Sequence, residues 1–382
     1  MRRWMAAPFL FAALTASTLL TDAPEAAAQD KKHPDPVEEN FKTADGVRIK
    51  GYFHKSANPL PSKGVVILLY EPGVGNSMNK PGDWEGLTKT LLDGDPKMGG
   101  FNVFRFDWRG HGKSKDITDP IEFWNNNITG PWNKKYVKGF NKKPIKNDID
   151  VKTDVANLKS YLPVLVNDLA AARLHLDEKN DAGDINSSSI YVIGAGDAAG
   201  LGFLWLAAEW ARPAIHPLLG GGVAYKLVPT NGITVDPEGG NDIAGAVWLS
   251  GTKPSIFPDR TVLYWTKLTP KLRDTNHMLM LYGEKDNASK AAANFFFKQV
   301  LVADGNKTIG IKKLDQTYVH ELKGTNLKGA ALLGNNKELT TEDTLMKFLM
   351  GREKDRGAVV TKKRGFTSPY YIDLLRFGAP PP

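Results

Sequence analysis

One carboxylate, Asp197, lies where a strand runs directly into a helix, in the segment IYVIGAGDAAG at residues 190–200. Small residues crowd this segment, as they do in the G-x-S-x-G turn that holds a nucleophile above a sheet. The segment contains neither Ser nor Cys, and its central position falls on Asp197, or on Gly196 if the register shifts by one. An Asp nucleophile can attack an sp3 carbon, whereas its attack on a carboxylic ester would give a strained anhydride. The segment therefore predicts a catalytic scaffold without its usual reactive atom.

The elements that must position this turn follow one another as alternating strands and helices. An uninterrupted apolar run at 65–70 predicts a strand buried on both faces, and 41–52 resembles a hairpin that turns at Asp45-Gly46. This order implies an α/β domain with a mainly parallel central sheet flanked by helices, and no second core is evident. Periodicity predicts further strands at 101–107, 190–193, 244–249, 277–282 and 308–314, and helices at 83–92, 162–176, 201–210 and 341–349.

The chain divides into a leader, a linker and one domain. Residues 1–28 combine an early basic pair, an apolar stretch and a final Ala-Ala-Ala, which predicts a secretory signal peptide and an exported protein, in a periplasm or outside the cell. Residues 29–40 are charged and contain Pro, and they indicate a linker before a single domain at 41–382. Within this domain, the aromatic, Asn- and Lys-rich segment 115–158 predicts a flap or lid after the fourth core strand, and 362–382 predicts a tail that packs back on the domain.

Composition narrows the possible chemistry. The 382 residues include no Cys, which excludes disulfides, thiolate metal sites and Cys nucleophiles. The formal net charge is +8, but the positive charge is spread over many short Lys pairs without a recognition motif, so we expect no nucleic-acid partner. No segment after the leader reads as a membrane span, and we expect no cofactor. The expected partner is a small-molecule substrate or ligand of unknown identity.

Three motifs together resemble the α/β-hydrolase superfamily over about residues 41–355. The sequence DWRGHGKS at 107–114 is similar to the D-x-R-G-H-G-x-S turn after the fourth strand of that fold, and its His111 is expected to be structural. The small-residue turn at 190–200 and the segment LYGEKD at 281–286 follow in the order of the family's nucleophile and acid. The resemblance therefore implies an α/β-hydrolase fold.

The resemblance also implies an acid and a base. The family's nucleophile, acid and His follow in that chain order, which implies Asp286 as the acid that orients a His, and His320, after the eighth strand, as the base. With Asp197 as nucleophile, this set is similar to dehalogenases and epoxide hydrolases of the family, whose alkyl-enzyme ester is hydrolysed by a His-activated water. Those enzymes usually have Trp directly after the Asp, and this chain has Ala198.

An oxyanion site is implied as well, built from one backbone N–H in the loop after the third strand and one directly after the nucleophile. With Asp197 as nucleophile, the second donor is Ala198. The loop reads EPGVGNS from Glu71; one alignment makes Gly73 the donor, and the other places Pro72 there, which has no N–H, so we prefer Gly73. A Glu71 carboxylate close to the site would oppose a developing oxyanion.

Two functions compete. In the first, the chain is an exported hydrolase with Asp197 as nucleophile or water-activating base, His320 as general base and Asp286 as the acid that orients it. In the second, it is a catalytically inactive protein of the same fold that binds a ligand, glycan or protein partner through the flap. Which residue stands at the centre of the turn separates the two. A metal site of Glu71, Asp197 and His320 is a third hypothesis, without a spacing signature.

Overall fold

Uninterrupted apolar runs build the centre of the sheet, where every residue of β3 to β7 is buried. The computed structural model describes residues 33–80, 82–212, 238–301, 319–334, 339–357, 359–362, 364 and 370–382. Residues His33–Pro382 form one compact unit. The described strands are β1 (Val37–Lys42), β2 (Arg48–His54), β3 (Val65–Leu69), β4 (Asn102–Phe106), β5 (Ile190–Ala195), β6 (Ile243–Leu249), β7 (Met278–Gly283) and β8 (Val319–Leu322).

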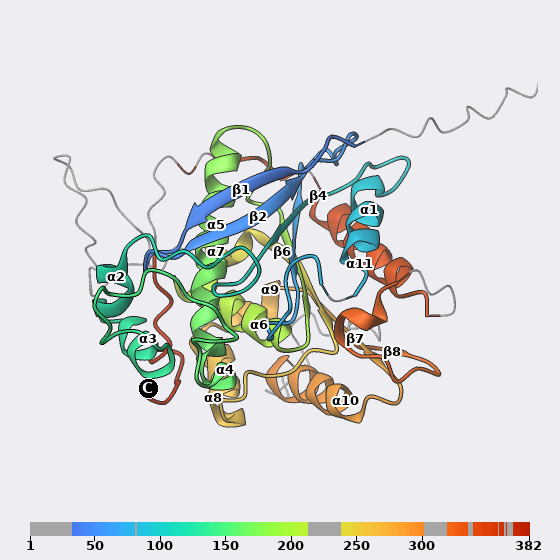
Figure 1. Cartoon of the computed structure of the whole chain (residues 1–382). Helices are drawn as coiled ribbons and strands as arrows, with labels where there is room; N and C mark the ends of the chain where they lie inside the picture. The colour runs from blue at the N-terminus through green and yellow to red at the C-terminus, as the bar shows by residue number, and fades with distance from the viewer. Residues whose placement is uncertain are drawn as a thin grey trace, which may run out of the picture. The chain divides into compact units, whose positions relative to one another are not determined.

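The strand order in the described part of the chain is β1-β2-β4-β3-β5-β6-β7-β8 (Figure 1). The hairpin of β1 and β2 pairs antiparallel with β4, and every pairing from β4 to β8 is parallel. Parallel neighbours need crossover connections, which the helices between them supply. A mainly parallel sheet of eight strands, in which β4 lies between β2 and β3, is the α/β-hydrolase fold, as the motifs indicated.

Helices cover both faces of this sheet (Figure 1). Helices α5 and α6 pack against each other on one face, and α1 and α11 pack against each other on the other. Among the described residues, no helix is long and apolar enough to cross a membrane. The helices outside the flap are α1 (Trp84–Asp93), α4 (Leu158–Tyr161), η1 (Leu162–Leu165), α5 (Val166–Asp181), α6 (Asp197–Ala211), α7 (Glu238–Asn241), α8 (Asp259–Leu268), α9 (Pro270–Thr275), α10 (Asn287–Asn294), η2 (Phe295–Leu301), η5 (Gly329–Leu332) and α11 (Thr341–Arg356).

The expected elements are present, with two exceptions. Residues 37–40, expected in the linker, belong to β1, because Val37 to Lys42 pair along the whole length of β2. The strand expected at 308–314 lies outside the described residues, and the eighth strand of the sheet is Val319–Leu322. The loop after the eighth strand therefore begins after Leu322.

The segment expected as a flap, 115–158, carries two short helices, α2 (Pro120–Asn125) and α3 (Gly130–Tyr136). It is attached to the domain by apolar and polar contacts: Phe123, Trp124 and Trp132 are buried in the hydrophobic core. The Thr129 hydroxyl also donates to Asp45 Oδ2 at 2.9 Å. The C-terminal tail also contacts it, since the Tyr371 hydroxyl donates a hydrogen bond to Glu122. The buried side chains of Ile372 and Phe377 hold the described part of the tail on the domain.

Candidate functional site

The turn at the end of β5 has Gly196 at its apex. β5 ends at Ala195, α6 begins at Asp197, and Gly196 between them has φ 54° and ψ −125°. Backbone of this kind is close to glycine-only, and a residue with a side chain in such a region carries strain of about 1–3 kcal/mol. Of the two residues that the sequence allowed at the centre of the turn, the structure therefore has Gly196 there. Asp197 is the first helical residue and does not stand at the centre of the turn.

The space above Gly196 is occupied by the carboxylate of Glu71. A Cβ atom on Gly196 would lie 2.5 Å from Cδ of Glu71 and 2.6 and 2.7 Å from its two carboxylate oxygens. These separations are well inside the optimal 3.5–4.0 Å or so between non-bonded carbon atoms, so a side chain at the apex and Glu71 in this position exclude each other. Burial, followed by the nearby carboxylate of Asp197, raises the pKa of Glu71 above its ordinary value.

The two backbone N–H groups expected to form an oxyanion site are not assembled. The N–H of Gly73 donates to Nε2 of His111 at 3.1 Å. Ala198 is the second residue after the apex, so the N–H that follows the apex is that of Asp197, and it already donates a hydrogen bond to Glu71. Ala198 does not directly follow the apex, because the apex is Gly196 and not Asp197. The Gly73 N–H is already engaged, because the buried imidazole of His111 accepts its hydrogen bond.

His111 is held in one tautomer by this arrangement. Because Nε2 accepts from Gly73, the proton of the neutral ring sits on Nδ1, which donates to the carbonyl oxygen of Arg109 at 3.0 Å. Burial lowers the pKa of His111, which favours that neutral form. Arg109 is itself fully buried between Asp45, at 2.6 Å, and Asp168, at 2.7 Å. Both residues therefore brace the turn after β4.

The carboxylate of Asp197 points to a neighbouring loop. It accepts a hydrogen bond from the hydroxyl of Thr252, which follows β6. In the described ranges, no hydrogen bond or ion pair joins Asp197 to His320. The structure thus does not bring the expected nucleophile and base together.

Asp286 lies at the end of β7, as the resemblance implied, but its partner is a lysine. Its carboxylate is buried and caps α10 by accepting from the Ser289 N–H at 3.2 Å. Lys328 places its Nζ atom 3.4 Å from Oδ1 of Asp286. Lys328 lies in the loop after β8, where the resemblance places the catalytic His. His320 instead lies inside β8, in register with Leu281, and no interaction between His320 and Asp286 is found among the residues that the structure describes.

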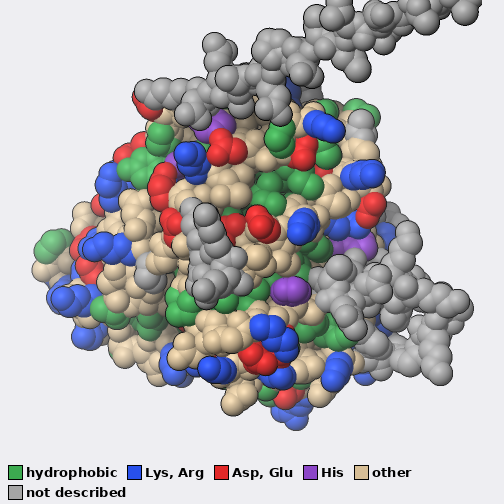
Figure 2. All heavy atoms as spheres, turned by 90° about the vertical axis from the view of Figure 1, so that its right-hand side faces the viewer, with side chains coloured by type: hydrophobic (Ala, Val, Ile, Leu, Met, Phe, Trp, Pro, Cys, Tyr) green, Lys and Arg blue, Asp and Glu red, His purple; other side chains and the backbone are tan. Residues whose placement is uncertain are grey.

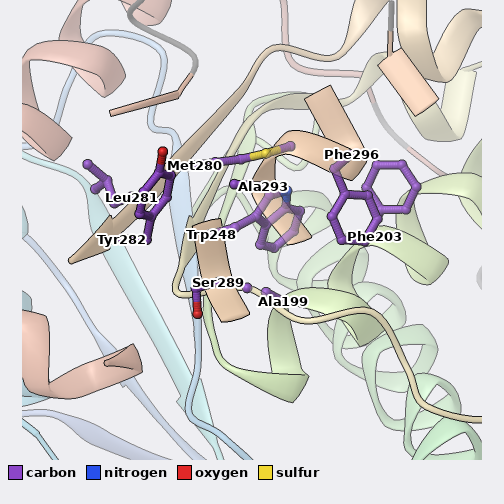
Figure 3. Close-up of a pocket in the computed structure, with 10 residues that line it drawn as sticks. Ala199, Phe203, Trp248, Met280, Leu281, Tyr282, Ser289, Ala293 and Phe296 are labelled. Atoms are coloured by element: carbon purple, nitrogen blue, oxygen red, sulfur yellow. The ribbon is translucent and has the colours of Figure 1, made fainter. Parts of the chain in front are cut away.

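No other chemical centre is evident near this turn. Among the described residues, no group of three or more His, Asp or Glu side chains could hold a metal ion, so Glu71, Asp197 and His320 do not form a ligand set. A small apolar cavity lies behind α6, where Phe203 and Phe296 face each other (Figure 3). Its volume is about 10 Å³, which is room for about one water molecule.

The chain shows only weak similarity to known proteins. No protein-family model matches the chain, and no curated protein does. Solved structures similar to it include an esterase of Pyrococcus furiosus, with 15% identity over 83% of this chain and 91% of that chain and a TM-score of 0.42. Esterase 2 of Thermogutta terrifontis matches with 12% identity over 87% and 98% of the two chains and a TM-score of 0.44. A fungal esterase of Rhizomucor miehei matches with 12% identity over 85% of this chain and 87% of that chain, with a TM-score of 0.44. Similarity this low supports no functional inference.

Two features of this site were not predicted from the sequence. Glu71 was expected in the loop after β3, but its carboxylate was not expected to fill the space above the apex. Lys328 was not a candidate because the family pattern calls for a His. The only signal for Lys328 is the position of β8, which ends at Leu322 and puts Lys328 in the loop that follows.

Proposed function

We propose that the chain is an exported protein of α/β-hydrolase fold that binds a ligand without hydrolysing it. The observation that carries this proposal is Gly196 at the apex with the Glu71 carboxylate in the space above it. A covalent mechanism needs a nucleophilic atom at this point, and a glycine offers none. Export rests on the leader at residues 1–28, and a mature N-terminus at Gln29 would support it.

The surroundings of the apex support the same proposal. A tetrahedral intermediate needs free N–H donors, and here Gly73 and Asp197 donate to His111 and Glu71. A general base needs a His oriented by the acid, and here Asp286 faces Lys328. Each part that hydrolysis requires is therefore engaged in a contact within the protein.

A substrate panel tests this proposal. Purified protein should turn over carboxylic esters, haloalkanes and epoxides no faster than its Asp197→Asn and Glu71→Gln variants. Fluorophosphonate probes, which label a reactive Ser, should leave the protein unlabelled, while a serine esterase serves as the positive control. Turnover of any substrate that is lost in Asp197→Asn, with thermal stability retained, would return the chain to the hydrolases and refute the proposal.

A further inference from the structure

The flap contains a hollow that is distinct from the β5 turn. It is an open depression of the surface with a volume of about 440 Å³. Several of its lining residues belong to a short antiparallel contact. In this contact Val137 and Val155 pair, Lys138 N donates to Asp154 O at 2.9 Å, and Ala156 N donates to Tyr136 O at 2.9 Å. This ladder gives the hollow a fixed backbone frame. The lining residues are Lys134, Lys135, Tyr136, Val137, Lys138, Gly139, Phe140, Asn141, Lys142 and Ala156.

The charge of this hollow is of one sign. Four of its lining side chains are Lys, and none is Asp, Glu or Arg. Within the described part of the chain, none of these four lysines has an ion pair with a carboxylate. The carboxylate of Asp154, in the adjoining antiparallel contact, is already held by Lys146 at 2.6 Å. By contrast, on the face that carries α1 and α11, Lys and Arg lie among Asp and Glu (Figure 2).

Three of the four ammonium groups are also held in place. Lys134 Nζ lies 4.7 Å from the centre of the Phe140 ring, and Lys135 Nζ lies 5.4 Å from that of Tyr136. Lys138 Nζ donates to the carbonyl oxygen of Thr153 at 3.0 Å. These contacts limit the rotamers of the lysines without neutralising their charge. A ligand with several anionic groups would therefore meet positive charges that are already positioned.

We propose that this lysine-lined hollow binds an acidic oligosaccharide, one whose sugar units carry carboxylate or sulfate groups. This inference rests on the proposed function, since it names the ligand of a protein that does not hydrolyse. Lysines offer point charges that suit separated single anions, whereas planar two-point recognition would call for Arg, and the hollow has none. The rings of Tyr136 and Phe140 are approached by ammonium groups, which disfavours them as stacking surfaces for the bases of a single-stranded nucleic acid.

The test uses the mature full-length protein and two quadruple variants of equal charge. The first replaces Lys134, Lys135, Lys138 and Lys142 with Gln. The matched control replaces four exposed lysines elsewhere, Lys89, Lys97, Lys267 and Lys354, with Gln. Calorimetric titration with oligogalacturonate, a sulfated oligosaccharide, neutral dextran and single-stranded DNA compares the ligands, and thermal unfolding checks that each variant is folded.

We expect both acidic oligosaccharides to bind and dextran to give no signal. The hollow variant should lose about tenfold or more in affinity, because it removes four exposed positive charges that each contribute a modest part of the binding. The control variant should stay close to wild type, and added salt should weaken binding. Failure of both acidic ligands, equal losses in the two variants, or tighter binding of DNA overturns the inference. Cleavage of a bound oligosaccharide would instead refute the proposed function and leave the binding site standing.

Discussion

Replacing Gly196 with Ala should cost much less stability when Glu71 is also shortened. In the native protein the new Cβ meets two penalties: backbone strain at φ 54°, about 1–3 kcal/mol, and overlap with the Glu71 carboxylate, about 1–3 kcal/mol. With Glu71→Ala in place, only the strain remains. The two substitutions should therefore show a coupling free energy of about 1–3 kcal/mol in favour of the double variant.

Urea unfolding of the four proteins, with the slope against denaturant unchanged, measures this coupling. Gly357 provides a matched control, because it has a similar backbone, φ 65° and ψ −160°, with no atom within 4 Å of an added Cβ. Gly357→Ala should carry strain alone and add independently to Glu71→Ala. A coupling for Gly196 no larger than that for Gly357 would show that Glu71 does not occupy the space above the apex.

Three further predictions concern the charges around the site. Folding raises the pKa of Glu71, so the ionised carboxylate is disfavoured in the folded state, and stability falls as the pH rises from the unfolded pKa through the raised one. Glu71→Gln should therefore stabilise the protein at neutral pH, and this gain should disappear in acid. Urea unfolding at a series of pH values measures the difference. Arg109→Met leaves two buried carboxylates unpaired and should cost about 3–5 kcal/mol, and a loss below about 1 kcal/mol contradicts the buried network. Asp286→Ala removes the cap of α10 and should cost about 1 kcal/mol in the same assay, and an unchanged free energy of unfolding argues against that role.

Much of the fold was predictable because its signals are local. Apolar runs such as 65–70 can be satisfied only in a buried strand, and the turn at 107–114 has a specific sequence pattern. A local pattern cannot fix the position of a turn where neighbouring residues are similar in size. Around β5 the segment GAGDAAG has several small residues, so two registers fit the spacing equally well. The residue at which β5 ends decides between them, and that depends on pairing with β3 and β6.

The candidate site was less predictable because its contacts join distant loops. Glu71 and Gly196 meet only through the path of the loop after β3. Lys328 meets Asp286 only because β8 ends at Leu322 and the following loop returns toward β7. His320 was predicted as the base from chain order alone, because it is the His that follows Asp286 near a strand. Sequence order supplies candidates for such a site, whereas strand ends determine which side chain reaches it.

Under the proposed function, the contacts at the β5 turn contribute to the folded state rather than to a reaction. A Ser at the apex would hold backbone strain of about 1–3 kcal/mol, which Gly196 avoids. The N–H of Asp197 satisfies the Glu71 carboxylate, and Asp286 caps a helix while it faces Lys328. If the proposal is right, hydrolysis at this turn would require several changes together: a side chain at position 196, a smaller residue at 71 and an imidazole beside Asp286. Any one of them alone removes an existing contact or adds a clash, so single substitutions should lower stability without producing turnover.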